Sequence, residues 1–184
     1  MPTEGPLAED IGWVPFESDT VKNIEFGVKG ALADGTYYNL SYFMVDWDNP
    51  QLNTSTPVNG YYAVVNGDTA QINGFDVELS GSAGAIDWNV GYSNKNARLS
   101  SDFYTPADTP VLYARSGANL PGSPDHTFNL NLAHTSYFGK TDDILSGMGM
   151  VNRLDLYAQS STRNYIGDNS AYDAEFDGFN IINA

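Results

Sequence analysis

The stretch that decides the fold reads NGFDVELSG, residues 73–81. Three apolar side chains alternate there with three polar ones: Phe75, Val77 and Leu79 against Asp76, Glu78 and Ser80. Successive side chains of a β-strand point to opposite faces, so this segment predicts a strand with one apolar and one acidic face. The same two-residue period recurs along most of the chain, in six expected strands and the start of a seventh. The sequence therefore predicts an all-β protein, an antiparallel meander of about 6–7 strands.

Composition excludes several classes of protein. The chain of 184 residues is long enough for one domain, and it carries 23 acidic against 8 basic residues, a net charge of −15. Binding to nucleic acid needs clustered Lys and Arg, so no nucleic-acid partner is expected. The absence of cysteine excludes disulfides, zinc ribbons and thiol catalysis. No apolar run approaches the length of a membrane helix, and the N-terminal residues do not resemble a signal peptide.

The connections between the expected strands alternate in length. Residues 1–20 are predicted to be an irregular loop segment, and the strands begin after it. Short connections are expected at 33–36 and 82–85, and long polar ones at 48–60 and 97–125. The link at 138–147 is longer than this alternation requires. One further strand is expected over about 61–82, with a bulge near Asn66-Gly67.

Short turns at one end and long loops at the other are typical of outer-membrane β-barrels. Three large aromatic residues near the short turns, Tyr37, Tyr38 and Trp88, are expected to form an interfacial girdle. The apolar faces carry no charge across their middle positions, whereas the polar faces carry a charge or an amide in nearly every strand. This favours a barrel over a β-sandwich. The residues predicted to face lipid are Ile24, Phe26, Val28, Leu40, Tyr42, Phe75, Val77, Leu79, Trp88, Val90, Phe128, Leu130, Leu132, Leu154 and Leu156.

Four motifs in order carry a resemblance to a known family: NIEFGVKGAL, YNLSYFMVDWDNPQL, NGDTAQINGFDVELSG and NLPGSPDHTFNLNL. Together they resemble the C-terminal part of the β-barrel of TonB-dependent outer-membrane receptors, over residues 21–184. The resemblance implies an incomplete piece of a 22-stranded transmembrane barrel, a fragment from which the plug domain and the final strands are absent.

The resemblance also implies a function. The expected location is the outer membrane of a Gram-negative bacterium, with outer-membrane lipid as a partner. The parent receptor would import a scarce ligand, a ferric siderophore or another large nutrient. It would be coupled to the TonB complex through parts of the protein not present here. This segment would contribute barrel wall and extracellular loops.

No catalytic residue, cofactor or metal is predicted, and the chain is not expected to be an enzyme. His126 and His134 share the apolar face but lie about 27 Å apart along a strand, too far for a common metal ion. Asp46 and Asp48 flank Trp47, which leaves carbohydrate cleavage as a weak alternative. Four acidic residues that form an acidic loop leave calcium binding open: Asp168, Asp173, Glu175 and Asp177.

Aromatic residues in or beside the long connections are the candidate ligand-binding residues, because exposed rings can stack on a ligand. They are Tyr61, Tyr62, Phe103, Tyr104, Tyr113, Tyr165 and Tyr172. The same rings could instead pack the loops against one another. The alternative function is that of a secreted carbohydrate-binding β-sandwich, with Trp13, Trp47 or Trp88 as the stacking platform. A complete small barrel, with the last strand paired to the first, is a third possibility.

Overall fold

The computed structural model describes residues 16–55, 62–104, 110–138, 147–166 and 174–184. Seven long strands form one antiparallel sheet in the order β1-β2-β5-β6-β9-β10-β13. Their bounds are β1 (Thr20–Ala31), β2 (Tyr37–Asp48), β5 (Thr69–Ala83), β6 (Ile86–Leu99), β9 (His126–Tyr137), β10 (Gly149–Gln159) and β13 (Phe179–Asn183). Each long strand pairs with the next one along the chain, so the predicted all-β antiparallel meander is confirmed. Among the residues described, no helix is long and apolar enough to span a bilayer.

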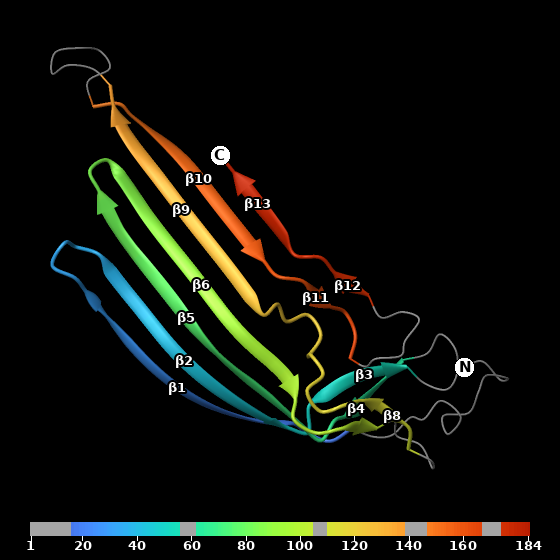
Figure 1. The fold of residues 1–184 in the computed structure, drawn as a ribbon. Coiled ribbons are helices and arrows are strands. Elements are labelled where there is room, and N and C mark those ends of the chain that lie inside the picture. The colour runs from blue at the N-terminus through green and yellow to red at the C-terminus, as the bar shows by residue number, and fades with distance from the viewer. Residues whose placement is uncertain (1–15, 56–61, 105–109, 139–146, 167–173) are drawn as a thin grey trace.

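Six short strands form three separate two-stranded ladders at one end of the sheet (Figure 1). They are β3 (Gln51–Ser55) with β4 (Tyr62–Asn66), β7 (Phe103–Tyr104) with β8 (Leu112–Ala114), and β11 (Thr162–Arg163) with β12 (Glu175–Phe176). The strand β3 lies in the predicted long connection 48–60 and the β7–β8 ladder in that of 97–125, whereas β4 falls in the strand expected over 61–82 and the β11–β12 ladder lies between β10 and β13. We call this the loop end, and the opposite end, where β1 joins β2 and β5 joins β6, the hairpin end.

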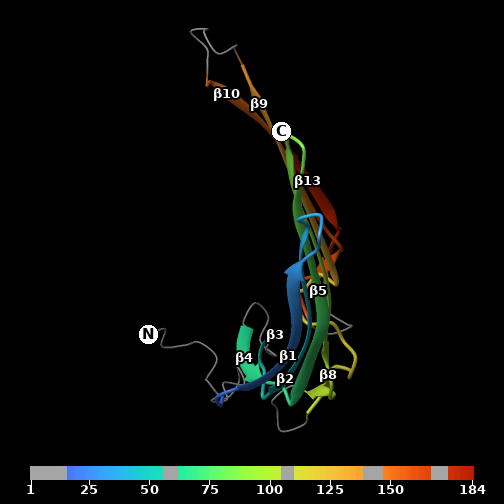
Figure 2. The same ribbon diagram turned by 90° about the vertical axis from the view of Figure 1, so that its left-hand side faces the viewer.

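The sheet is open and forms a single curved layer. Figure 2 shows the sheet nearly edge-on and curved along its length, with β3 and β4 on its concave side. Strands β1 and β13 lie at opposite edges and do not pair with each other, so the described strands do not close into a small barrel. No second sheet covers a face of the long strands within the described ranges, which contradicts the sandwich alternative. The prediction of an incomplete piece of a larger barrel is confirmed.

Strand register gives each face of the sheet a distinct chemistry. Directly opposed residues share a face, and Phe26 lies opposite Tyr42, which in turn lies opposite Phe75. Near the middle of the sheet Val90 lies opposite Leu130. We call the face that carries these side chains the outer face, and the face on the side of β3 and β4 the inner face. Every residue predicted to face lipid lies on the outer face.

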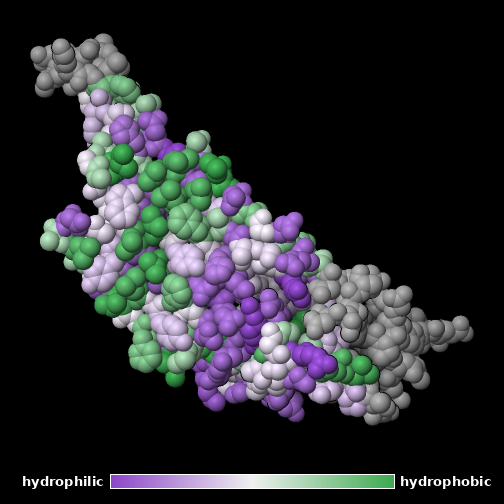
Figure 3. Space-filling model, viewed as in Figure 1, coloured by the Kyte–Doolittle hydropathy of each residue, from purple (hydrophilic) through white to green (hydrophobic). Residues whose placement is uncertain are grey.

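No described part of the chain packs against the apolar half of the outer face. Phe26 is 66% exposed, Val28 55% and Phe75 40%, although such side chains gain about 1.5–3 kcal/mol each when they are fully buried. Figure 3 shows this face, with apolar residues concentrated in the half toward the hairpin end and polar residues toward the loop end. The strands β1, β2, β5, β6 and β9 have 12–15 residues, more than the roughly 9–11 that cross a bilayer, so they extend into the polar half.

The predicted aromatic girdle is only partly correct. Tyr38 and Trp88 lie on the outer face, where their rings cover the glycines of the neighbouring strand, Gly30 and Gly81. Tyr37 lies opposite Ala31 and Ser80 and therefore belongs to the inner face. The prediction was wrong for Tyr37 because adjacent residues of a strand point to opposite faces.

The hairpin end is built from tight turns. In the first turn Gly35 has a φ of 85°, and its N–H donates to the carbonyl of Leu32 (3.0 Å). In the second turn Gly84, with a φ of 64°, is the first of two residues between Ala83 and Ile86, the position that favours glycine in a type II′ hairpin. The β9–β10 connection starts at the same end, where the Phe138 N–H donates to Met148 (2.9 Å); residues 139–146 lie outside the described ranges.

The strand expected over 61–82 is two strands, β4 and β5, with a break at Gly67-Asp68. The β2–β5 ribbon continues into the β3–β4 ladder through hydrogen bonds from Gly67 N to Pro50 O (2.8 Å) and from Asn49 N to Asp68 O (2.9 Å). Asn49 has a φ of 54°, a left-handed conformation that Asn tolerates well. A Cβ at Gly67 would lie 2.9 Å from Leu52 Cδ1, so glycine permits the close approach at this bend.

Candidate ligand-binding site

The loop end contains a small apolar core on the inner face. It joins the ends of β5 and β6 to residues of the short ladders and loops: Leu52, Val65, Ala70, Ala97, Leu99, Phe103, Ala114, Leu120 and Ile166. Trp47 packs against this core, and its indole N–H donates to Asp19 (2.8 Å). Long loops that bury this much apolar surface are held in a defined arrangement, which is what a binding site on loops requires.

Aromatic rings connect this core to the loop surface. Phe103 is 2% exposed and meets Tyr113 edge-on, with 5.5 Å between ring centroids. Tyr113 in turn lies 5.5 Å from Tyr165. The three rings therefore form one aromatic row that joins two connections, the one between β6 and β9 and the one between β10 and β13.

The predicted ligand-binding aromatics occupy different environments. Phe103 belongs to the core, so its ring packs the loops together. Tyr113 and Tyr165 are half-buried, and Tyr104 is 49% exposed. Tyr62 lies in β4, and Tyr61 and Tyr172 fall outside the described residues. A role in ligand binding stays a prediction for all of them.

The segment 115–122 is fixed against the end of β6 by backbone hydrogen bonds. Gly117 N donates to Leu99 O (2.8 Å), Leu99 N to Ala118 O (2.9 Å), and Leu120 N to Ala97 O (3.0 Å). Gly117, with a φ of 90°, allows the turn that brings this segment onto the strand.

Two further contacts anchor the other side of this segment. Gly122 N donates to Arg163 O (2.8 Å), which ties the segment to β11. Arg98 forms a two-pronged ion pair with Asp125, with its shorter contact, Nη2 to Oδ2, at 2.9 Å. The segment is thereby held between β6 and β11.

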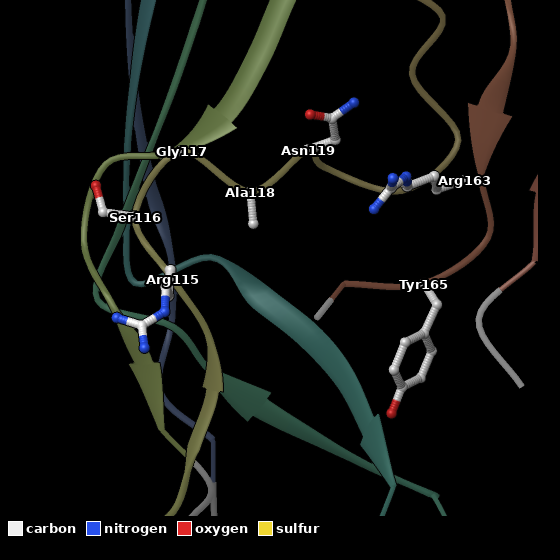
Figure 4. A pocket seen from close by; sticks show the side chains of 7 residues that line it. All are labelled: Arg115, Ser116, Gly117, Ala118, Asn119, Arg163 and Tyr165. Carbon is white, nitrogen blue, oxygen red and sulfur yellow. The ribbon is translucent and has the colours of Figure 1, made fainter. Parts of the chain in front are cut away.

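A hollow of about 330 Å³ lies between these anchored segments, lined by Arg115, Ser116, Gly117, Ala118, Asn119, Arg163 and Tyr165. Figure 4 shows residues 115–119 on one side and Arg163 and Tyr165 on the other, with the Arg163 side chain reaching into the space between them. Its volume falls at the small end of the range of roughly 300–1,000 Å³ that is usual for ligand pockets.

Arg115, Asn119 and Arg163 were missed by the sequence analysis, which searched the loops for aromatic residues only. A signal was present: the chain has 8 basic residues, and these two arginines fall within or beside long connections of a strongly acidic protein. That they line one hollow depends on how the 97–125 and 160–174 connections meet in space.

The inner face of the long strands carries a network of polar side chains. Asn89 donates to Glu78 (3.4 Å) and accepts from Asn129 (3.2 Å), and Asn131 donates to Asp155 (2.9 Å). Such hydrogen-bonded amides and carboxylates suit a surface that faces water, as the lumen of a barrel does.

The structure also places the two histidines and the two aspartates that the sequence offered as candidate site residues. Both histidines lie on the outer face, and His126 Nδ1 is 2.9 Å from the Tyr92 hydroxyl. Asp46 accepts from Gln71 (2.9 Å) and Asp48 pairs with Lys22 (3.4 Å), so both carboxylates are engaged by neighbouring strands.

The acidic loop at 168–177 lies partly outside the described residues. Asp168 and Asp173 lie outside the described residues, and within the described ranges no group of three potential ligands could hold a metal ion. Calcium binding at this loop is therefore not tested.

Comparison with known proteins agrees with this geometry. The family described as "TonB dependent receptor-like, beta-barrel" matches residues 4–184. This chain belongs to the TonB-dependent receptor β-barrel family. No curated protein matches it.

Among solved structures, this TonB-dependent receptor segment is similar to the siderophore receptor PirA from Acinetobacter baumannii. The TM-score is 0.55 at 11% sequence identity, and the match covers 91% of this chain and 25% of that receptor. At this identity the likeness shows the fold alone. The segment thus spans about a quarter of the length of the receptor that it matches.

Proposed function

We propose that this chain forms part of the wall and extracellular loops of an outer-membrane receptor that imports a scarce small molecule, with a ferric siderophore as the first candidate. The observation that carries the proposal is the pairing of an unpacked apolar outer face with a hydrogen-bonded polar inner face on one open, curved sheet. Hydrocarbon on one side and a water-filled interior on the other satisfy both faces at once.

The location follows from the same faces. The outer face would contact lipid of a Gram-negative outer membrane through the fifteen apolar and aromatic side chains that the sequence predicts to face lipid. Exposed apolar surface of this extent is rare on monomeric soluble proteins and marks a site of interaction with a membrane or partner. The loop end would then lie on the outside of the cell.

The ligand and energy source rest on the family. PirA is described as a siderophore receptor, which supports ferric siderophores as the first class to test. The TonB complex would act through parts of the receptor beyond this chain. The structure supports a ligand site at the loop end, where the described loops share a core and enclose a hollow.

The proposal is tested in a Gram-negative host whose own siderophore receptors are deleted. The receptor that contains this chain is expected to restore growth under iron limitation on at least one ferric chelate in an anionic, neutral and cationic series. Restored growth should disappear when the TonB gene is removed. Failure to restore growth on any chelate, with the receptor present in the outer-membrane fraction, would refute iron import.

A further inference from the structure

We propose that His126, in its neutral form, holds β6, β9 and the β10–β11 connection together at the loop end, and that acid loosens these contacts. The inference goes beyond the proposed function, because it holds whichever ligand the receptor imports. It rests on three features of the structure: the contacts of the imidazole ring, the charges beside it, and the backbone bonds of His126.

The ring nitrogen Nδ1 of His126 has two hydrogen-bonding neighbours on β6. It lies 2.9 Å from the Tyr92 hydroxyl and 3.2 Å from the side-chain nitrogen of Asn94. A second contact sets the orientation of the Asn94 amide, because the same nitrogen donates to the backbone carbonyl of Asp125 (3.2 Å). An amide nitrogen donates hydrogen bonds and does not accept them, so Nδ1 is the acceptor. His126 is therefore neutral here, with its ring proton on Nε2.

A second proton on this ring would remove the match with Asn94. An imidazolium ion carries a proton on each nitrogen, so Nδ1 would change from an acceptor to a donor. The Tyr92 hydroxyl can turn to accept such a bond, but the Asn94 nitrogen cannot. Two N–H groups would then point at each other, and either the ring or the amide must turn away. If the amide turns, its bond to the Asp125 carbonyl is lost as well.

The charged groups beside His126, within the described residues, are already paired with each other. Asp125 directly precedes His126, and its carboxylate accepts two hydrogen bonds from Arg98 of β6. The other groups that face the ring from β6 are the Tyr92 hydroxyl and the neutral amide. Across from His126 on its other side lies Ser160, which carries no charge. Because the carboxylate of Asp125 is engaged by a guanidinium group, it offers little compensation for the lost contact with the amide.

The backbone of His126 carries the connection to the other side. Its N–H donates to the Ser160 hydroxyl (3.1 Å), and the Ser160 N–H donates to its carbonyl (3.0 Å). Ser160 lies two residues before β11, where the Arg163 carbonyl accepts from Gly122 N (2.8 Å). His126 thus joins β6, through its ring, to one wall of the hollow, through its backbone. Loss of the ring contacts should loosen both.

Protons from the medium can reach these contacts. His126 is exposed, and it is the first residue of β9, at the loop end. Histidine is the side chain that ordinarily gains its proton between pH 8 and 5. Since the loop end would lie outside the cell, the acidity of the medium would set how firmly β6 and the β10–β11 connection are held together.

The test uses the whole receptor that contains this chain, purified in detergent. Hydrogen exchange is followed by mass spectrometry at about pH 7.5 and about pH 5, across the range in which histidine ordinarily titrates. The reporters are two backbone amides: Lys95 N donates to Asp125 O (2.9 Å), and Ser160 N donates to His126 O (3.0 Å). Their protection factors, which divide out the direct effect of pH on exchange, are expected to fall about 3–10-fold in acid, the effect of losing one ordinary hydrogen bond.

Three variants separate His126 from other sources of pH dependence. His126→Gln cannot gain a proton, so its protection factors should be the same at both pH values. Asn94→Ala removes the amide that a protonated ring would meet, so the acid effect should shrink although His126 is still present. His134→Gln is the matched control, because His134 lies on the same strand and the same face; the acid effect should persist unchanged.

Equal protection at both pH values in the unaltered receptor would overturn the inference. A full acid effect in His126→Gln or in Asn94→Ala would also overturn it, as would loss of the effect in His134→Gln. If His126→Gln does not fold, the comparison of the unaltered receptor with Asn94→Ala and His134→Gln still decides the question.

Discussion

Arg98 near the end of β6 and Asp125 just before β9 are joined by two hydrogen bonds, 3.1 Å from Nη1 to Oδ1 and 2.9 Å from Nη2 to Oδ2. Between them in sequence lie the whole of the β7–β8 ladder and the 115–122 segment that forms one wall of the hollow. The ion pair therefore closes a loop of the chain at the point where the candidate site begins. Its side chains are only 25% and 37% exposed, which limits screening by water.

Loss of this pair should loosen the wall of the hollow. We expect Asp125→Ala to destabilise the segment from Leu120 to Gly122 by about 1 kcal/mol, since a bidentate pair with good geometry lies at the upper end of the range for surface ion pairs. Amide hydrogen exchange at Leu120 and Gly122 measures this as faster exchange. Lys22→Ala is the control, because its pair with Asp48 has a single 3.4 Å contact and a lysine that is 70% exposed. Equal changes in both variants would contradict the prediction.

The assignment of the two faces predicts a large difference between neighbouring positions of β9. Leu130→Arg places a charge on the outer face, where the cost at a bilayer midplane is about 2–4 kcal/mol. Asn129→Arg falls on the inner face and should cost about 1 kcal/mol, for the lost hydrogen bond to Asn89. The measurement is the folded fraction of the parent receptor in outer membranes, scored by heat-modifiable mobility on gels. Similar losses at the two positions would show that the register is wrong.

At Gly74, on the inner face, the neighbouring backbone leaves no room for a Cβ. A Cβ at Gly74 would collide with the Asn94 carbonyl and would come 2.8 Å from the Phe43 ring. Gly74→Ala should therefore destabilise the receptor by about 1–3 kcal/mol, the usual cost of overpacking. At Gly27 a Cβ would make only ordinary contacts, 3.4 Å and longer, so Gly27→Ala is the matched control and should be tolerated. Denaturant unfolding of the two variants in detergent compares them; a tolerated Gly74→Ala would argue against this close approach.

The first hairpin turn should respond to acid. The backbone N–H of Thr36 donates to the Asp34 carboxylate (3.0 Å), and this hydrogen bond, with a second from the Thr36 side chain, lowers the pKa of Asp34 below its ordinary value. A lowered pKa means that the carboxylate stabilises the turn above the ordinary value of about 3.9, and that the contribution is lost as pH falls through the lower folded value. The Thr36 amide chemical shift should titrate below pH 3.9. In Asp34→Asn it should not titrate, and a midpoint above 3.9 in the unaltered protein would contradict the assignment.

The sequence by itself determined the long strands and their faces. A two-residue period such as that of residues 73–81 assigns each side chain to a face, and all of the predicted lipid-facing residues lie together because antiparallel pairing in register preserves that assignment from strand to strand. The short connection predicted at 33–36 is a turn for a local reason, since Gly35 adopts a positive φ. The girdle prediction failed for Tyr37 because closeness to a turn indicates how far along the strand a residue lies but does not indicate which face it occupies.

Only the tertiary structure decided what the long connections do. Short ladders such as β3–β4 and β7–β8 have too few residues to produce a period, and they are held by contacts to β5 and β6 across long sequence separations. For the same reason Phe103 could not be recognised as a core residue, nor Arg115 and Arg163 as neighbours. Alternation along a strand is a local property that the chain carries in its order of residues. A hollow between loops exists only where distant segments meet, and nothing in their individual sequences records that meeting.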